Sequence, residues 1–448
     1  MFATFKNAWK ITDLRAKMLF TLLIVLIYRL GASVPLPYVS KAALDSFNTF
    51  AAGSILQYMN ILSGDAFGKA TLFALSVSPY ITASIVIQLL TVAIPALQRL
   101  SKDGEEGRKK INSITRYATV VLAIITAYGY MQIMNSYGML VSGINWFGKL
   151  VLIVCYCAGA AIIMWLAEKV NEHGIGNGIS IILFANIIAR VPTLLWQVWR
   201  MMFSEANGFS TLFKGFRWWG ILLAVLSLGI TLAMTIFIVW FTNSERRIPI
   251  LYAKRVVGRK MYGGQSSNLP IKLNMSGVMP IIFASSIVSI PATIGSFTGG
   301  KFQTFMEKYF NYNTWLYFLI YMALIVVFSF FYILISFDPV EVANNIQKNG
   351  GSIPGIRSGR PTVAYIKKIL NRITLIGAVF LCIVAGLPIL ISIINNLINP
   401  NSTTLAGIAF GGNSLLIVVG VIIELVHDLE AQVALRSYGK SQIKGIFG

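Results

Sequence analysis

Charged residues are scarce in this sequence. Asp, Glu, Lys and Arg make up 12% of its 448 residues, whereas 56% are hydrophobic and the mean hydropathy is +0.72. A soluble domain is about 25% charged, so the composition excludes an ordinary cytosolic enzyme, a disordered protein and a nucleic-acid-binding module. It indicates a polytopic membrane protein.

Cysteine and histidine are also rare. The three cysteines, Cys155, Cys157 and Cys382, lie in apolar runs without a CxxC or Cys/His cluster. This pattern indicates neither a zinc site nor disulfides, and we interpret each Cys as a small buried hydrophobe. A Walker motif is missing, because Ala434 stands where Gly439-Lys440-Ser441 would need an upstream glycine. With two histidines and no HExxH motif, we expect no enzyme activity, metal or cofactor, and any energy from ATP would come from a partner.

Long apolar runs are what the sequence has in abundance. A membrane-spanning helix needs about 20 mainly apolar residues. Ten such runs lie at residues 18–36, 70–94, 116–136, 147–167, 178–198, 219–242, 275–296, 314–337, 373–396 and 413–430. We therefore predict an all-α polytopic protein with ten transmembrane helices. The first run lacks a small-residue cleavage pattern, so we expect a retained anchor rather than a signal peptide.

Basic residues outnumber acidic ones by 37 to 16, which gives a net charge of +21. Ten spans place both termini on one side, and that side carries 27 of the 37 Lys and Arg residues. By the positive-inside rule, this side is the cytoplasm. Its two long loops, about 243–274 and 338–372, exceed the few residues that a connection needs. We interpret them as docking surfaces for a large partner; the alternative is a plain topology signal.

Three segments do not fit uninterrupted spans. Residues 53–64 are apolar, bracketed by glycines and too short to span, which suits a re-entrant helix beside an aqueous cavity. The alternative is an amphipathic surface helix. Residues 76–82 and 276–286 mix Pro, Ser and β-branched residues within the second and seventh runs. Such interruptions at corresponding places of two halves suggest an inverted repeat around a central path; the alternative is two kinked packing helices.

Ionisable residues deep within the runs are nearly absent. Arg29 and Arg190 are the candidates, and we expect both near span ends or snorkelling. Glu424, His427 and Asp428 fall late in the last run. A proton- or sodium-coupled transporter usually carries Asp, Glu or His at mid-membrane. A secondary transporter is therefore the weaker alternative to a channel whose substrate is driven by another protein.

Several longer strings occur in order along the chain. They are Asn60-Ile-Leu-Ser-Gly64, Ser78-Pro-Tyr-Ile-Thr-Ala-Ser-Ile-Val-Ile-Gln-Leu-Leu90, Gly107-Arg-Lys-Lys-Ile111, His173-Gly-Ile-Gly-Asn-Gly-Ile-Ser180, Tyr252-Ala-Lys-Arg255, Phe283-Ala-Ser-Ser286, Pro354-Gly-Ile-Arg357 and Gly411-Gly-Asn-Ser-Leu-Leu-Ile-Val418. Through them the sequence resembles the SecY family over essentially its whole length. The resemblance implies ten spans in two pseudo-symmetric five-helix halves around a central hourglass pore, with a short re-entrant plug helix and a lateral gate between spans 2 and 7.

The resemblance also implies a function. SecY proteins conduct unfolded secretory polypeptides across the bacterial cytoplasmic membrane and release transmembrane segments sideways into lipid. The implied partners are SecE, SecG, the SecA ATPase, the ribosome, signal peptides and unfolded preproteins, with YidC and SecDF as further candidates. An accessory paralogue that serves a few glycosylated exports would have reduced cytoplasmic loops, so the full-length loops favour the housekeeping form.

The same resemblance divides the chain. It implies a cytoplasmic N-terminus over 1–17, a first half over 18–200, a second half over 201–430 and a cytoplasmic tail over 431–448. Both termini are expected in the cytoplasm.

Functional positions of the family can be carried over to this sequence. The hydrophobic pore ring falls on Val77, Ile81, Ile179, Leu183, Ile282 and Ile417. The plug falls on about 53–64 and includes Gly53, Ile55, Leu56, Tyr58, Met59, Asn60, Leu62 and Gly64. The lateral gate falls on Thr82, Gln88, Ser285, Ser286 and Ile290, and the docking residues are Arg357, Arg255, Arg259 and Lys260. The chain departs from the family at Asp65, where many members have a second glycine after Gly64.

Overall fold

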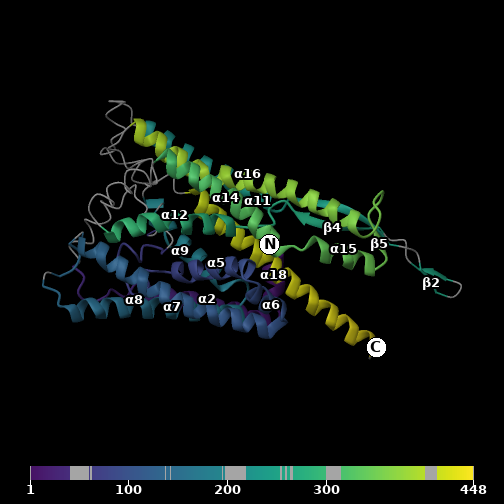
Figure 1. Cartoon of the computed structure of the whole chain (residues 1–448), viewed down its shortest axis with the longest axis horizontal. Helices are drawn as coiled ribbons and strands as arrows, with labels where there is room; N and C mark the ends of the chain where they lie inside the picture. The colour runs from purple at the N-terminus through teal and green to yellow at the C-terminus, as the bar shows by residue number, and fades with distance from the viewer. Residues whose placement is uncertain are drawn as a thin grey trace.

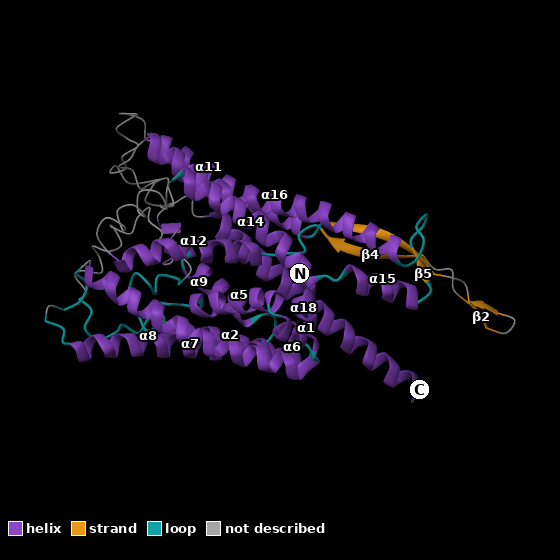
Figure 2. Cartoon of the chain, viewed as in Figure 1, coloured by secondary structure: helices purple, strands orange, loops and turns teal. Residues whose placement is uncertain are grey.

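The structure is a computed structural model that describes residues 2–40, 60, 63–136, 138–141, 143–193, 195–196, 218–252, 255–257, 260–262, 266–298, 314–398 and 411–446. These residues are mostly helical (Figure 2). The helices are α1 (Phe2–Trp9), α2 (Thr12–Gly31), α5 (Ser78–Ala93), α6 (Pro95–Lys102), α7 (Gly104–Ser136), α8 (Trp146–His173), α9 (Gly178–Ala189), α11 (Trp218–Thr242), α12 (Met279–Thr298), α14 (Trp315–Ser336), α15 (Pro339–Lys348), α16 (Arg360–Ile398) and α18 (Gly411–Ile446). Each of the ten apolar runs overlaps one of these helices.

Fewer helices meet the full requirements of a membrane span. Four described stretches are long and apolar enough: Gly104–Asn135, Trp146–His173, Trp315–Lys348 and Arg360–Ile394. A bent pair, α5 with α6, turns by 106° and would count as a fifth. The number of ten transmembrane helices therefore stays a prediction, although the protein is a multi-pass membrane protein by the count of long apolar helices.

The expectation of an all-α fold is wrong in the long loops. Strands β1 (Glu245–Tyr252), β4 (Ser266–Lys272) and β5 (Gly351–Ser352) form an antiparallel sheet in the order β4-β1-β5. Strands β2 (Arg255–Val257) and β3 (Lys260–Tyr262) form a separate antiparallel pair. In β1, Ile248 and Ile250 are buried while the residues beside them are exposed, which is the two-residue period of a half-buried strand.

A small hydrophobic core joins this sheet to two helices. It contains Ile248 and Ile250 of β1, Ile346 of α15, and Ile366 and Leu370 of α16. We call the sheet, α15 and the first turns of α16 the loop unit. Because α16 begins at residue 360, the second long loop ends earlier than expected. The loop unit and the end of α18 lie at the same end of the molecule (Figure 1).

The second run is helical over part of its length. Residues 70–77 form turns, and α5 begins at Ser78 with Pro79 in its first turn. Proline lacks an N–H and has a fixed φ, so it suits the first turn of a helix better than its interior. Helix α12 begins in the same way, with Pro280 as its second residue. The two interrupted segments are thus helix starts, at corresponding places before and after residue 200.

The helices before residue 200 pack against those after it in several places, which include a contact of α1 with α18. Helix α9 contacts α18, and α12 contacts both α5 and α7. In Figure 1, α7 and α8 lie along one side of the molecule and α14 and α16 along the other, with α9 and α12 between them. The centre of the molecule therefore lies where α5, α9, α12 and α18 meet.

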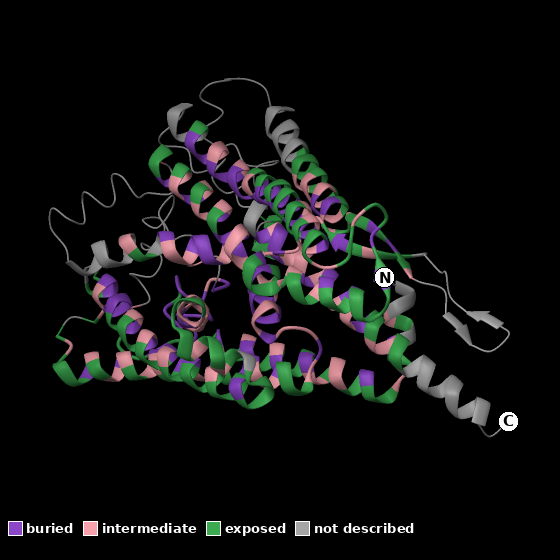
Figure 3. Ribbon diagram, turned by 45° about the vertical axis from the view of Figure 1, so that its right-hand side comes forward, coloured by how far each residue is buried: buried purple, intermediate pink, exposed green. Residues whose placement is uncertain are grey.

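Many large apolar residues are exposed, and exposed positions are spread along the outer helices (Figure 3). Trp146, Trp240 and Leu334 are 77%, 66% and 72% exposed. Extended apolar surface of this kind is rare on a soluble monomer and suits contact with lipid. Helix α18 passes through residue 430 without a break, so the last apolar run and the predicted tail form one continuous helix.

Candidate functional site: a central aliphatic cluster and its cavity

The six residues predicted for the pore ring belong to one hydrophobic cluster. Val77, Ile81, Leu183 and Ile417 are buried members of it, and Ile179 and Ile282 pack against it while partly buried. They come from α5 and the residue before it, from α9, from α12 and from α18.

Their positions follow from helix geometry. The Ile81 N–H donates to the Val77 carbonyl at 3.0 Å, so these two side chains lie one turn apart, and Ile179 and Leu183 share the same spacing on α9.

A cavity of about 480 Å³ lies on one side of this cluster. Leu183, Ile282 and Ile417 line its apolar end, and Glu424 and Asp428 line it further along α18. The seven steps from Ile417 to Glu424 correspond to about 10 Å along a helix. Toward the loop unit, Lys272 and Asn274 are among the residues that line the cavity. The cavity thus runs from an aliphatic floor to polar and charged walls on the side of the sheet.

The residues predicted for the lateral gate lie on two helices in contact. Thr82 and Gln88 belong to α5, and Ser285, Ser286 and Ile290 belong to α12. Their hydroxyls bond within their own helices, with Thr82 donating to the Ser78 carbonyl at 3.0 Å and both serines donating to the Ile282 carbonyl at 2.9 and 2.8 Å.

Separating α5 from α12 would leave those three bonds intact. The contact of α12 with α7 was not expected, since sequence reasoning considered α5 alone.

Most of the predicted plug lies outside the described residues. Gly53, Ile55, Leu56, Tyr58, Met59 and Leu62 are among these, whereas Asn60 and Gly64 are described. The Asn60 side-chain oxygen accepts a hydrogen bond from the Gly68 N–H at 2.7 Å. The backbone carbonyl of Asn60 accepts one from the Asp65 N–H at 3.0 Å. These bonds tie the end of the predicted plug to the turns that lead into α5.

A polar cluster beside these turns was not predicted. Arg190 follows the last residue of α9, and its Nε lies 3.0 Å from Oδ1 of Asp65. Asn186, one turn earlier on α9, is fully buried and donates to the Ser76 hydroxyl at 3.2 Å. Arg190 lies at a helix end as expected, but it forms an ion pair within the protein instead of snorkelling.

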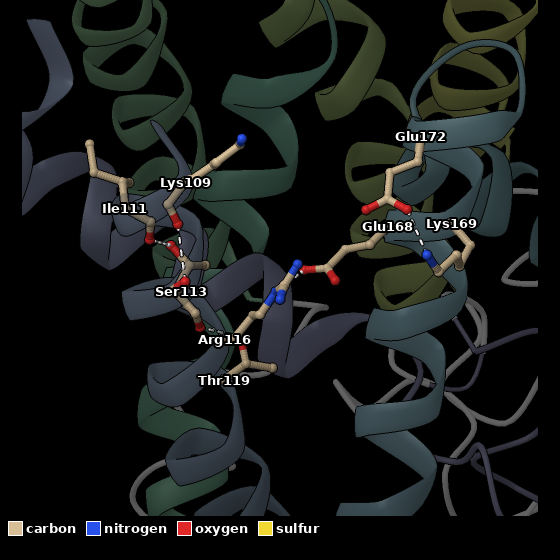
Figure 4. Close-up of polar contacts among 9 residues, drawn as sticks. Lys109, Ile111, Ser113, Arg116, Thr119, Glu168, Lys169 and Glu172 are labelled. Carbon is tan, nitrogen blue, oxygen red and sulfur yellow. Dashed lines mark hydrogen bonds and ion pairs between the residues drawn. The ribbon is translucent and has the colours of Figure 1, made fainter. Parts of the chain in front are cut away.

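A second ion pair joins α7 to α8. Arg116 Nε lies 2.7 Å from Glu168 Oε1, and the two side chains face each other in Figure 4. Next to Glu168 on α8, the Lys169 ammonium donates to the exposed Glu172 carboxylate at 2.7 Å. Among the described residues, no group of three His, Cys, Asp or Glu side chains could hold a metal ion.

Comparisons with known proteins identify the family of the chain. The sequence model of the SecY family matches residues 71–426. The chain is 39% identical to a protein translocase subunit SecY of Streptomyces galbus, over 98% of the chain and 99% of that protein. It is 38% identical to the protein of the same name from Thermotoga maritima, over 99% of the chain and all of that protein. The chain belongs to the SecY family.

Solved structures agree with the SecY fold. One described as "The structure of a protein conducting channel" has a TM-score of 0.61 at 17% identity and covers 93% of this chain and 92% of that one. Another, Sec61 in the canine ribosome–channel complex from the endoplasmic reticulum, has a TM-score of 0.58 at 16% identity, with the same coverage. At these identities the likeness establishes the fold alone.

Of the predicted docking residues of this SecY-family chain, Arg357 lies in the turn between β5 and α16, and two others lie in the β2–β3 pair. Arg357 is exposed and follows Gly355, whose φ is +78°, a conformation that suits glycine. The turn is anchored on both sides, because Ile353 is buried and the Thr362 hydroxyl donates to the Arg357 carbonyl at 2.9 Å. Arg255 and Lys260 belong to β2 and β3, and Arg259 lies outside the described residues.

Proposed function

We propose that the chain is the channel subunit of a bacterial Sec translocase. In this role it conducts unfolded polypeptides across the cytoplasmic membrane and releases transmembrane segments into lipid between α5 and α12. The proposal is supported by the family, by the names of its relatives and, above all, by the aliphatic ring residues Leu183, Ile282 and Ile417 that line the apolar end of the cavity.

The aliphatic cluster suits a seal for such a channel. A path for unfolded chains must admit polar, charged and aromatic side chains in turn, yet it must not leak ions at rest. Polar groups would bind some side chains and keep the path hydrated, whereas a narrow aliphatic constriction closes by dewetting. An ion there would lose its hydration without replacement ligands. Aliphatic contacts are also weak and non-directional, so they can surround varied residues without trapping them.

The arrangement of the helices suits the proposed role as well. Ten spans in two five-helix halves would place α2 to α9 in one half and α11 to α18 in the other, so that the halves enclose the cavity. The seam between α5 and α12 would open sideways without breaking the three intrahelical bonds of its hydroxyls. The plug over about 53–64 would rest on the outer side of the ring.

The partners follow from the absence of an ATP-binding motif. SecA or a translating ribosome would supply the driving force at the loop unit, while SecE and SecG would complete the complex. One structural neighbour is Sec61 in a ribosome–channel complex, and another is a Ssh1 complex bound to the yeast ribosome. Signal peptides and unfolded preproteins would enter through the cavity, and YidC and SecDF would act on emerging chains.

Resting ion conductance tests the proposed seal. We expect Ile81→Ser with Ile417→Ser to raise the conductance of the purified complex in planar bilayers several-fold, because two hydroxyls would hydrate the constriction. Replacing all six ring residues should raise it further and loosen the selection of signal sequences. The matched control is Ile133→Ser with Leu152→Ser, two buried aliphatic residues of a separate cluster between α7 and α8. Unchanged conductance in assembled ring variants would assign the six residues to packing and place the seal elsewhere.

A further inference from the structure

The ion pair between Asp65 and Arg190 occupies a specific place in the proposed channel. Asp65 directly follows the predicted plug, and residues 66–76 lead from it to Val77, the first residue of the predicted ring. Arg190 directly follows α9, which carries the ring residues Ile179 and Leu183. The pair therefore connects the chain between plug and ring to a helix that helps to form the ring.

Both partners are well shielded. The side chains of Arg190 and Asp65 are 13% and 25% exposed, whereas those of the Arg116–Glu168 pair are 48% and 17% exposed. Burial reduces screening by water and salt, so such a pair holds its elements together more firmly than an exposed one. Charged groups within the membrane region of a protein are costly and are retained mainly where they serve a function.

The surrounding contacts restrict the same segment further. Gly64 has a φ of +64°, and a Cβ there would lie 3.0 Å from the Asn186 carbonyl oxygen and 2.9 Å from Arg29 Nη1. Asp65 and Ser76 also have positive φ values, of +70° and +51°, which are uncommon for residues other than glycine. The Asn186–Ser76 bond fixes the end of the segment that is next to the ring. Helix α9 thus contacts both ends of residues 64–76.

We propose that Asp65 and Arg190 are positioning residues that hold the connection between plug and ring in its resting place. Separation of the two charges would release the end of the plug, so the pair sets how readily the channel opens. The inference rests on the proposed channel function. It also explains a departure from the family, because a second glycine at position 65 could not form this pair.

Resting conductance of the purified, assembled complex measures the role of the pair. We expect Asp65→Asn and Arg190→Gln each to raise it several-fold and to permit export of precursors with defective signal sequences. The charge-swapped double variant, Asp65→Arg with Arg190→Asp, should have a lower resting conductance than either of its component single variants. Asp65→Glu keeps the charge and should stay close to the original protein. If the neutral variants fail to assemble, comparison of the swapped double variant with Asp65→Glu still tests the pairing.

The outcomes separate this inference from the channel function. Glu168→Gln removes the Arg116–Glu168 ion pair with the same change of charge as Asp65→Asn. It should not raise the resting conductance. If the neutral variants conduct as little as the original protein while the ring variants conduct more, the role of the pair is overturned and the proposed channel function stands. If the ring variants show no increase in resting conductance, the proposed seal itself is overturned. A leak in Asp65→Glu equal to that in Asp65→Asn would show that packing, not charge, positions the segment.

Discussion

At the scale of single residues, close packing of this protein depends on glycines at helix crossings. Gly159 on α8 faces the backbone of Leu72, and a Cβ there would lie 2.1 Å from the Leu72 carbonyl oxygen. Gly178 at the start of α9 would meet the Ala167 carbonyl oxygen at 2.0 Å. Small residues at such crossings allow helix backbones to approach within the membrane. These two glycines fix the distance of α8 from the turns before α5 and from α9.

We therefore expect Gly159→Ala to destabilise the protein by about 1–3 kcal/mol, the usual cost of overpacking. The backbone oxygen cannot move aside as a flexible side chain could. Gly229→Ala is the control, because a Cβ at Gly229 on α11 meets no atom within 4 Å, and alanine is the better helix former. Thermal unfolding of the purified complex should show a lower Tm for Gly159→Ala and an unchanged or higher Tm for Gly229→Ala. Equal Tm values would contradict the packing argument.

Sequence reasoning at this scale identified types of residue better than pairs. It selected Ile81, Leu183 and Ile417 through the family resemblance, and the structure places them in one cluster, although their role in a seal stays a prediction. It did not identify the Asp65–Arg190 pair, because 125 positions separate the two residues and neither has a local signal that specifies its partner. The positions of Arg29 and Arg190 within apolar runs were the available signal, since a charge there needs a partner.

At the scale of elements, the ten apolar runs were informative because hydrophobicity alone determines where a membrane helix can form. Local context decided their ends. Helix α5 begins at Ser78, because Pro79 suits the first turn of a helix. Helix α16 begins at Arg360, since the helical pattern continues ahead of the apolar run. The long loops have hairpin-like patterns in the sequence, but the sheet of the loop unit was not predicted, since β5 pairs with β1 across about 100 residues. Alternation in β1 was visible in the sequence, but its partners were not.

The loop unit leads to a prediction about docking. Arg357 stands on a turn whose neighbours Ile353 and Thr362 are fixed, so it presents a planar charged group with little freedom. We expect Arg357→Glu to impair SecA-driven export at least several-fold, while membrane insertion and SecE binding persist. Precursor accumulation in cells and export into vesicles measure the effect.

The control for docking is Arg15→Glu, which makes the same change of charge at an exposed residue of α2, outside both long loops. It should export normally. Equal export by the original protein, Arg357→Lys and Arg357→Glu would return Arg357 to a plain topology charge.

At the scale of the whole molecule, two independent observations bear on orientation in the membrane. The sequence gathers 27 of the 37 basic residues into segments assigned to one side. In the structure, the loop unit and the end of α18 lie at the same end of the molecule (Figure 1). Because the positive-inside rule relates basic loops to the cytoplasm, we predict that this end is cytoplasmic.

Labelling of single cysteines with a membrane-impermeant reagent tests this orientation. The native Cys155, Cys157 and Cys382 are first replaced, since all three are partly accessible. Ser358→Cys is the cytoplasmic site, because Ser358 is exposed, whereas its neighbour Gly359 has a φ of +97° that a cysteine would adopt only with strain. Asn145→Cys, exposed before α8, is the opposite site.

In intact cells the reagent should label Asn145→Cys and leave Ser358→Cys unmodified, and inverted vesicles should reverse this result. Labelling of Ser358→Cys from outside would contradict the orientation. Labelling of both sites from the same side would also contradict the number of spans between them, because an odd number must separate residues on opposite faces.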